Sequence, residues 1–178
     1  MRTRHGMRFF GLLALLLAAG AALTACGATP SAQADDLARF VPERYNDWQR
    51  DDRDTVRLRS NTILNTGHVT MIYEGPDDAI AYIVIEVHPT EDAAQVAATT
   101  RLREWHTQGL ALDANRAPQQ VTADVAQSDR VRYALLREGN TVIEIDAIAA
   151  EGEAPISDVA FEDLLFMVRN AFVRVAES

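Results

Sequence analysis

The sequence predicts an α+β fold, with an antiparallel sheet of about 5–6 strands and two helices packed on it. Two observations predict this class. Apolar runs with strand-like patterns are separated by turns rich in glycine, asparagine and aspartate. Two longer segments instead place apolar residues at helical spacing. The expected element order is β-β-β-α-β-β-β-α.

The first group of elements contains three candidate strands. Residues 55–59 (TVRLR) alternate and predict a short strand, and residues 68–74 (HVTMIYE) alternate over a longer stretch. Residues 79–87 (AIAYIVIEV) are almost continuously apolar and predict a central strand, covered or nearly covered on both faces. The turn residues 75–78 (GPDD) join the last two strands into a hairpin. Before them, Trp48 lies in an apolar entry segment that we expect to be a loop or short helical turn.

A helix is predicted from Thr90 to about Gln108. Thr90 is a suitable N-cap residue, and acidic residues follow it in the first turn. Gly109 is a typical stop signal. The apolar stripe of this helix consists of Ala94, Ala97, Ala98, Leu102 and Trp105.

The second half of the chain repeats the strand pattern. Candidate strands cover residues 121–126, 129–138 and 141–149, and Gly139–Asn140 forms a two-residue hairpin turn between the last two. Alternation places Ile143, Ile145, Ala147 and Ala149 inward and Glu144 and Asp146 outward. Ser157 caps a final helix, whose apolar stripe consists of Phe161, Leu164, Leu165, Val168 and Phe172.

The first 25 residues have the features of a secretory signal peptide. Arg2, Arg4 and Arg8 precede an apolar run from Phe9 to Leu23. That run has 15 residues, whereas a helix that spans a membrane needs about 20. A positive head, a short apolar middle and a small-residue end predict a leader that is removed. An N-terminal membrane anchor or a buried helix is the alternative.

The end of the leader reads Leu23-Thr24-Ala25-Cys26, and Cys26 is the only cysteine of the chain. This motif resembles the lipobox of bacterial lipoproteins. The resemblance implies cleavage before Cys26 and a diacylglyceryl group on its thiol. Two acyl chains hold a protein on a membrane where one chain is marginal. The alternative is ordinary cleavage that leaves a free cysteine.

The predicted mature chain begins at Cys26 and contains one domain. Small and polar residues at 26–39 predict a lipidated cysteine and a flexible tether of up to ~40 Å, followed by a single domain at 40–178. The leader holds three of the 17 basic residues and none of the 26 acidic ones, which leaves a formal charge of −12. Such a charge opposes binding to nucleic acid. The element order loosely resembles the PsbP/Mog1-type sandwich, and this similarity rests on element order alone.

Three histidine and glutamate residues are candidates for a metal site. His68 begins one strand of the predicted hairpin and His88 follows the other, so antiparallel pairing brings them side by side. Glu86 lies on the same face as His88. Two histidines and a carboxylate are ligands for zinc or copper. The alternative is that these are plain surface residues, and we expect no metal or other cofactor.

Paired carboxylates and aromatic residues are the other candidates for a site. Glu144 and Asp146 share the outer face of a strand, and we expect Arg130 and Arg132 on the neighbouring strand to pair with them. Acid–base catalysis by these carboxylates would need a cleft. A second group could line an apolar pocket but is more typical of a core: Tyr45, Trp48, Tyr73 and Trp105.

The sequence carries no catalytic motif of the common kinds: no G-x-S-x-G, no H-E-x-x-H and no phosphate-binding loop. We therefore expect a non-enzymatic lipoprotein, anchored through Cys26 outside the cytoplasm on the cell membrane or on an outer membrane. Its role would be binding or assembly, with an envelope protein as the expected partner. The alternatives are a lipoprotein that binds a small apolar ligand or a metal and, after that, an enzyme.

Overall fold

The computed structural model describes residues 29–51, 65–113 and 121–176. Within these residues it shows an α+β fold with one seven-stranded antiparallel sheet. The strand order is β1-β2-β3-β4-β7-β6-β5. The strands are β1 (Arg44–Tyr45), β2 (Trp48–Arg50), β3 (Gly67–Glu74), β4 (Ile80–Val87), β5 (Asp124–Gln127), β6 (Val131–Glu138) and β7 (Thr141–Ile148). The predicted fold class is confirmed, with more strands than expected.

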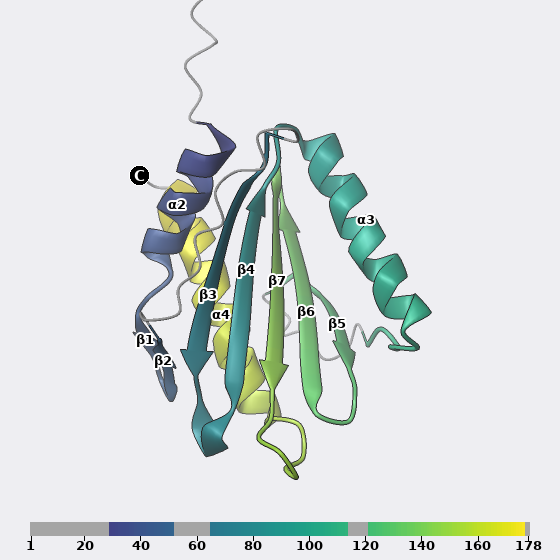
Figure 1. The fold of residues 1–178 in the computed structure, drawn as a ribbon. Helices are drawn as coiled ribbons and strands as arrows, with labels where there is room; N and C mark the ends of the chain where they lie inside the picture. Colours follow the sequence, from purple (N-terminus) through teal and green to yellow (C-terminus); the bar gives the residue numbers. More distant parts are fainter. Residues whose placement is uncertain (1–28, 52–64, 114–120, 177–178) are drawn as a thin grey trace, which may run out of the picture.

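Three α-helices cover the two faces of the sheet: α2 (Pro30–Phe40), α3 (Glu91–Thr107) and α4 (Asp158–Ala176). Helices α2 and α4 pack on one face, where they enclose the main hydrophobic core (Figure 1). Helix α3 packs on the opposite face, over β6 and β7, and encloses a second and smaller apolar cluster. The prediction of two helices is wrong because α2 was not foreseen.

The predicted hairpin of β3 and β4 is confirmed, with a short 3₁₀ turn, η1 (Pro76–Asp78), between the strands. Alternate residues of β4 are buried on the α2 and α4 side, and its residues on the α3 side are partly covered. Strand β4 therefore lies at the centre of the sheet, as predicted, but only one of its faces is fully buried. The hairpin of β6 and β7 is also confirmed, with Glu138 opposite Thr141 across the predicted turn.

Helices α3 and α4 begin at the predicted caps. The Thr90 hydroxyl accepts a hydrogen bond from the Ala93 amide at 3.1 Å, and the Ser157 hydroxyl accepts one from the Ala160 amide at 3.2 Å. Helix α3 ends before Gly109, whose φ of +81° suits glycine. The predicted stripe of α4 lies in the main core, with Phe161, Leu164, Leu165 and Val168 buried and Phe172 partly buried.

Trp48 anchors the N-terminal edge of the sheet to α4. Its side chain is 0% exposed, and its indole Nε1 donates a hydrogen bond to the Ala160 carbonyl at 2.9 Å. The ring lies against Gly75, where a Cβ atom would stand 2.2 Å from it. The prediction that Trp48 packs on the core is confirmed, but its segment forms the edge strands β1 and β2 and not a loop. The predicted strand at 55–59 lies outside the described residues.

Helix α2 contradicts the predicted tether over residues 30–39. Thr29 caps it, with its hydroxyl accepting a hydrogen bond from the Ala32 amide at 3.3 Å, and proline opens its first turn. Ala34 and Leu37 are buried in the main core. The start of the helix lies so close to β3 that a Cβ atom on Gly67 would stand 2.1 Å from the Pro30 carbonyl oxygen. The folded domain therefore includes residues 30–39, which the prediction placed outside it.

Replacing Leu37 by alanine is expected to lower the free energy of unfolding by about 2 kcal/mol, because it opens a cavity among well-packed side chains. Leu37 is 5% exposed, whereas Leu112 is 52% exposed and provides a matched Leu→Ala control. Urea unfolding of both variants measures the difference. A flexible tether would instead predict that the two substitutions have equally small effects.

Candidate functional site

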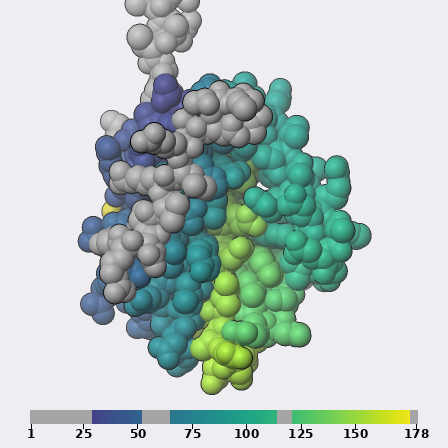
Figure 2. Space-filling view, viewed as in Figure 1, coloured from purple at the N-terminus to yellow at the C-terminus, as the bar shows by residue number. Residues whose placement is uncertain are grey.

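A cleft between α3 and the sheet is lined by several ionisable side chains. Its volume is about 230 Å³. In Figure 2, atoms of β7 are visible in the hollow between β4 and α3. The lining residues come from β4, α3 and β7 and are Val84, Glu86, Ala97, Thr100, Arg101, Glu104, Val142 and Glu144.

Arg101 connects α3 to the sheet across this cleft. Its Nε lies 2.9 Å from Oε2 of Glu144 on β7, and its NH1 group lies 3.1 Å from Oε2 of Glu104, one turn along the same helix. Small residues precede it on α3, and two of them, Ala94 and Ala98, are buried in the apolar cluster between this helix and the sheet. Arg101 is the guanidinium that lines the cleft, and both of these partners are carboxylates.

Glu144 is buried enough to change its ionisation. Its side chain is only 14% exposed. Burial, followed by the negative charge of Asp146, raises the pKa of Glu144 from 4.5 to about 7. The charge of Arg101 and a hydrogen bond from Trp105 oppose this rise without cancelling it. Glu144 is therefore about half protonated at neutral pH.

Asp146 lies two residues along β7 on the same face as Glu144. Burial raises its pKa, and the charge of Arg101 opposes the rise. Its Oδ1 atom is buried and has no hydrogen-bond partner among the described residues. The alternation correctly predicts that Glu144 and Asp146 lie on the face of the sheet opposite the main core. That face is not open to solvent at these residues, however, because α3 packs on it. Both carboxylates are largely removed from solvent.

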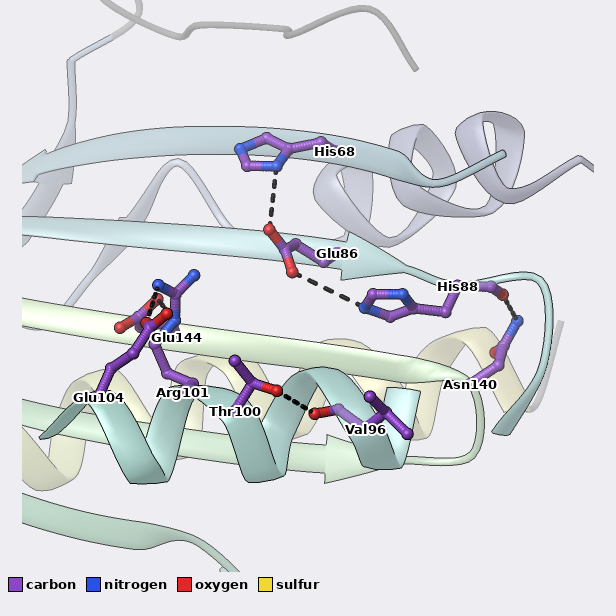
Figure 3. Close-up of polar contacts among 9 residues, drawn as sticks. All are labelled: His68, Glu86, His88, Val96, Thr100, Arg101, Glu104, Asn140 and Glu144. Carbon is purple, nitrogen blue, oxygen red and sulfur yellow. Dashed lines mark hydrogen bonds and ion pairs between the residues drawn. The ribbon is translucent and has the colours of Figure 1, made fainter. Parts of the chain in front are cut away.

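Glu86 lies between two histidines (Figure 3). Its Oε1 lies 3.3 Å from Nδ1 of His68, and its Oε2 lies 3.7 Å from Nε2 of His88. The hydrogen bond with His68 lowers the pKa of Glu86 in spite of partial burial. The other ring nitrogen of His68 lies 3.1 Å from the Thr70 hydroxyl. The predicted hairpin brings both histidines to Glu86, but the two rings do not lie side by side as predicted, because His68 pairs with Glu86 across the strands.

Backbone contacts position His88 at the end of β4. Its amide donates to the Asn140 carbonyl at 2.8 Å, and its carbonyl accepts from Nδ2 of Asn140 at 2.8 Å. The same Asn140 amide group donates to Gln33 of α2 at 3.2 Å. The turn between β6 and β7 thus fixes both the histidine and the start of α2. Nε2 of His88 is buried and has no hydrogen-bond partner within the described part of the chain.

The arrangement of His68, Glu86 and His88 does not favour a metal ion. Glu86 stands between the two rings, with one carboxylate oxygen directed at each histidine (Figure 3). In residues 29–51, 65–113 and 121–176, no group of three or more histidine, cysteine or acidic side chains is placed so that it could hold a metal. We therefore interpret His68 and His88 as residues that stabilise the negative charge of Glu86.

The predicted pairing of Arg130 and Arg132 with Glu144 and Asp146 is wrong. Across the β6–β7 ladder, Glu144 stands opposite Leu135 and Asp146 stands opposite Tyr133. Arg132 belongs to the other face, where NH1 lies 2.6 Å from Asp158 at the start of α4. Arg130 donates to the Ala149 carbonyl at 2.9 Å. The arginine that pairs with Glu144 comes from a helix on the opposite side of the cleft, which no strand alternation could indicate.

The aromatic residues named as candidates for a pocket belong to the two apolar clusters. Trp48 and Tyr73 are fully buried in the main core, and Tyr45 packs against its edge. Trp105 is buried under α3, with its ring centroid 5.6 Å from that of Tyr133. These side chains therefore pack in the apolar clusters, which is the interpretation that their spacing in the sequence favoured.

Sequence reasoning missed Arg101 and Glu104 as site residues. The available signal was helical spacing, because Arg101 follows Ala97 by four residues and precedes Trp105 by four, on the stripe that faces the sheet. A charged residue on such a stripe predicts a buried or half-buried partner across the interface.

Comparisons with known proteins assign no family. No family model matches the chain, and no curated protein matches it. The solved extracellular domain of PknH from Mycobacterium tuberculosis is similar over 62% of this chain and 64% of that domain, with 14% identity and a TM-score of 0.36. This chain thus spans somewhat less than two thirds of that domain, and a likeness of this degree assigns neither fold nor function. None of the described helices has the length and apolar character needed to span a membrane.

Proposed function

We propose that this protein is a lipoprotein outside the cytoplasm, whose α+β domain is a non-enzymatic binding module held on a membrane through Cys26. The observation that supports this proposal most directly is the motif from Leu23 to Cys26, placed directly after a positive and apolar leader. These residues lie outside the described part of the chain, so the argument for them is one of sequence.

The position of α2 adds a spatial consequence to this proposal. Because α2 begins at Pro30, residues 27–29 separate Cys26 from this helix. The four Cα–Cα steps from Cys26 to Pro30 span at most about 15 Å. A lipid on Cys26 would therefore hold the domain close to the membrane, with the start of α2 and the neighbouring end of β3 nearest to it (Figure 1).

The cleft under α3 favours binding of a small ligand over assembly with a protein partner. Its polar groups converge on a partly enclosed volume of about 230 Å³ over apolar residues of two strands. Convergent polar groups over an apolar floor are typical of small-molecule sites. An acid–base enzyme is the other use of such carboxylates, but the contacts described above hold Glu86 and Glu144 in charge pairs.

Metabolic labelling with a fatty-acid probe tests the anchor. The wild-type chain is expected to carry the probe and to sediment with membranes, whereas Cys26→Ala removes the only thiol and abolishes both. Thr29→Ser keeps a capping hydroxyl nearby and serves as the matched control, with labelling equal to wild type. Unlabelled wild-type protein would contradict the proposed anchor and would leave the binding properties of the domain to be judged separately.

A further inference from the structure

We propose that α3 is a pH-controlled cover of the sheet, which is docked at mildly acidic pH and opens locally as the pH rises through neutrality, with Glu144 as the group that responds. This device belongs to the folded domain and needs neither the anchor at Cys26 nor a ligand. It is supported by the small apolar contact of α3, by the convergence of its polar contacts on Glu144, and by the charge balance beneath the helix.

A small apolar cluster holds α3 to the sheet. From the helix, Ala94, Ala98 and Trp105 are buried in it, and two of these three have only a methyl side chain. Helices α2 and α4 instead pack on the main core, which lies on the other face of the sheet (Figure 1). Elements with little buried apolar surface open at a lower free energy than the rest of a domain. Helix α3 is therefore the helix that we expect to leave the sheet while the main core stays packed.

The polar contacts from α3 to the sheet meet at Glu144 of β7. Nε of Arg101 lies 2.9 Å from Oε2 of Glu144, and the Trp105 side chain donates a hydrogen bond to the same carboxylate. Among the described residues, the other side-chain hydrogen bonds of α3 stay within the helix. The charge of Glu144 therefore acts on both polar contacts that α3 makes with the sheet in the described part of the chain.

The carboxylates beneath α3 are not fully compensated by positive charge. Glu144 and Asp146 lie two residues apart on the same face of β7, and the positive charge that acts on both is that of Arg101. Oδ1 of Asp146 is buried and has no hydrogen-bond partner among the described residues. When both carboxylates are ionised, one guanidinium faces two partly buried negative charges. Release of the helix returns these charges to water, which lowers their free energy.

Titratable and charged side chains reach this face from all the elements around Glu144. They are Glu86 and Tyr82 from β4, Asp146 from β7, Tyr133 and Arg137 from β6, and Arg101 and Glu104 from α3. Glu86 is paired with His68 and His88, and the hydrogen bond with His68 lowers its pKa, so Glu86 stays ionised through the neutral range. Ionisation of Glu144 therefore adds to negative charge that is already present.

The direction of the pH effect follows from proton linkage. With α3 docked, burial and the charge of Asp146 raise the pKa of Glu144 from 4.5 to about 7. Opening returns this side chain to water, so its pKa falls back toward 4.5 and the open form binds the proton less tightly. The docked form is therefore fully favoured below about pH 4.5, and its advantage is lost as the pH rises through about 7. The equilibrium constant for opening should rise by up to about tenfold between about pH 6 and about pH 8.

Native-state hydrogen exchange of the full-length protein in detergent, measured by mass spectrometry over α3 and α4, tests the proposal. After correction for the intrinsic exchange rate, protection of the α3 amides is expected to fall about tenfold between about pH 6 and about pH 8. At about pH 8, exchange in α3 should depend only weakly on low concentrations of urea. Exchange in α4 should depend strongly on urea, because α4 packs on the main core and exchanges through global unfolding.

Two substitutions and a matched control identify the group that responds. Glu144→Gln cannot ionise, so α3 should lose most of the tenfold change in protection. Arg101→Gln removes the guanidinium that compensates ionised Glu144, so opening should increase several-fold at about pH 8 and much less at about pH 5. Arg103→Gln, at an exposed position of the same helix, is the control and should behave as the wild type does.

Two histidine variants separate Glu144 from the other side chains that could respond near neutrality. Histidine is the residue type that ordinarily titrates in this range, and His68 and His88 both contact Glu86. Neither contact involves α3. His68→Gln and His88→Gln should therefore each leave the pH dependence of α3 protection in place.

Three outcomes would overturn the proposal: α3 protection that does not change with pH, equal protection and urea dependence in α3 and α4, or a pH dependence that the histidine variants abolish and Glu144→Gln keeps. Circular dichroism shows whether each variant is folded at both ends of the pH range. Should Glu144→Gln not fold, the contrast between Arg101→Gln and Arg103→Gln still decides. Cys26 is intact in every variant, so these results are independent of the membrane anchor.

Discussion

Replacing Trp48 by alanine is expected to lower the free energy of unfolding by about 4 kcal/mol. Trp48 is completely buried, and it joins the edge of the sheet to α4 through its indole hydrogen bond to Ala160. Removal of the ring leaves a large cavity at this junction. Because small domains are stable by about 5–15 kcal/mol, this one change removes a large fraction of the total. Urea unfolding followed by circular dichroism measures the loss.

Two further variants separate the contributions of Trp48. Trp48→Phe keeps an aromatic ring but leaves the Ala160 carbonyl without its donor, and a loss of about 1–2 kcal/mol is expected. Val159→Ala, at a position 70% exposed on the same helix, should change stability by less than about 0.5 kcal/mol. If Trp48→Ala were no more harmful than Val159→Ala, the described packing of β2 on α4 would be wrong.

Replacing Glu144 by glutamine is expected to remove much of the pH dependence of stability around neutrality. Burial and the charge of Asp146 raise the pKa of Glu144 from 4.5 to about 7, so the folded protein binds this proton more tightly than the unfolded chain does. Stability therefore falls as the pH rises from about 4.5 through about 7. For a pKa shift of this size, the free energy of unfolding falls by at most about 3 kcal/mol above neutral pH.

The glutamine variant cannot ionise and should lack this loss. Between about pH 5 and about pH 8, the unfolding free energy of the wild type should decrease relative to that of Glu144→Gln, which loses only the ion pair with Arg101. Glu151→Gln, at an exposed position, should follow the wild-type curve. Parallel curves for the wild type and Glu144→Gln would show that Glu144 titrates near its ordinary pKa, and the cleft would then be open to water.

Local patterns predicted most of the regular elements. The β3–β4 and β6–β7 hairpins, and the caps at Thr90 and Ser157, depend on residues that are neighbours in the sequence, so a single sequence contains the required information. The meeting of His68, Glu86 and His88 was also predictable, because one hairpin and its register bring them together.

The prediction of a flexible tether at residues 30–39 was wrong, because the helix there depends on contacts with residues far away in the sequence. Residues 30–39 are small and polar, with few apolar side chains, and in isolation they favour an exposed linker. Helix α2 nevertheless forms because Ala34 and Leu37 bury against β3, β4 and α4, and because Gly67 admits the start of the helix close to the strand. Most of the stability of a short helix comes from such tertiary packing and not from its own propensity.

The sequence by itself determined the α+β class, the two hairpins, the amphipathic helices and the motif around Cys26, because each depends on residues close together along the chain. Only the tertiary structure decided which face of the sheet α3 covers. That choice turns Glu144 and Asp146 from surface residues into half-buried carboxylates, and it supplies Arg101 as their counter-ion. The ionisation of a carboxylate depends on its distance from water and from other charges, and α3 sets both at this site.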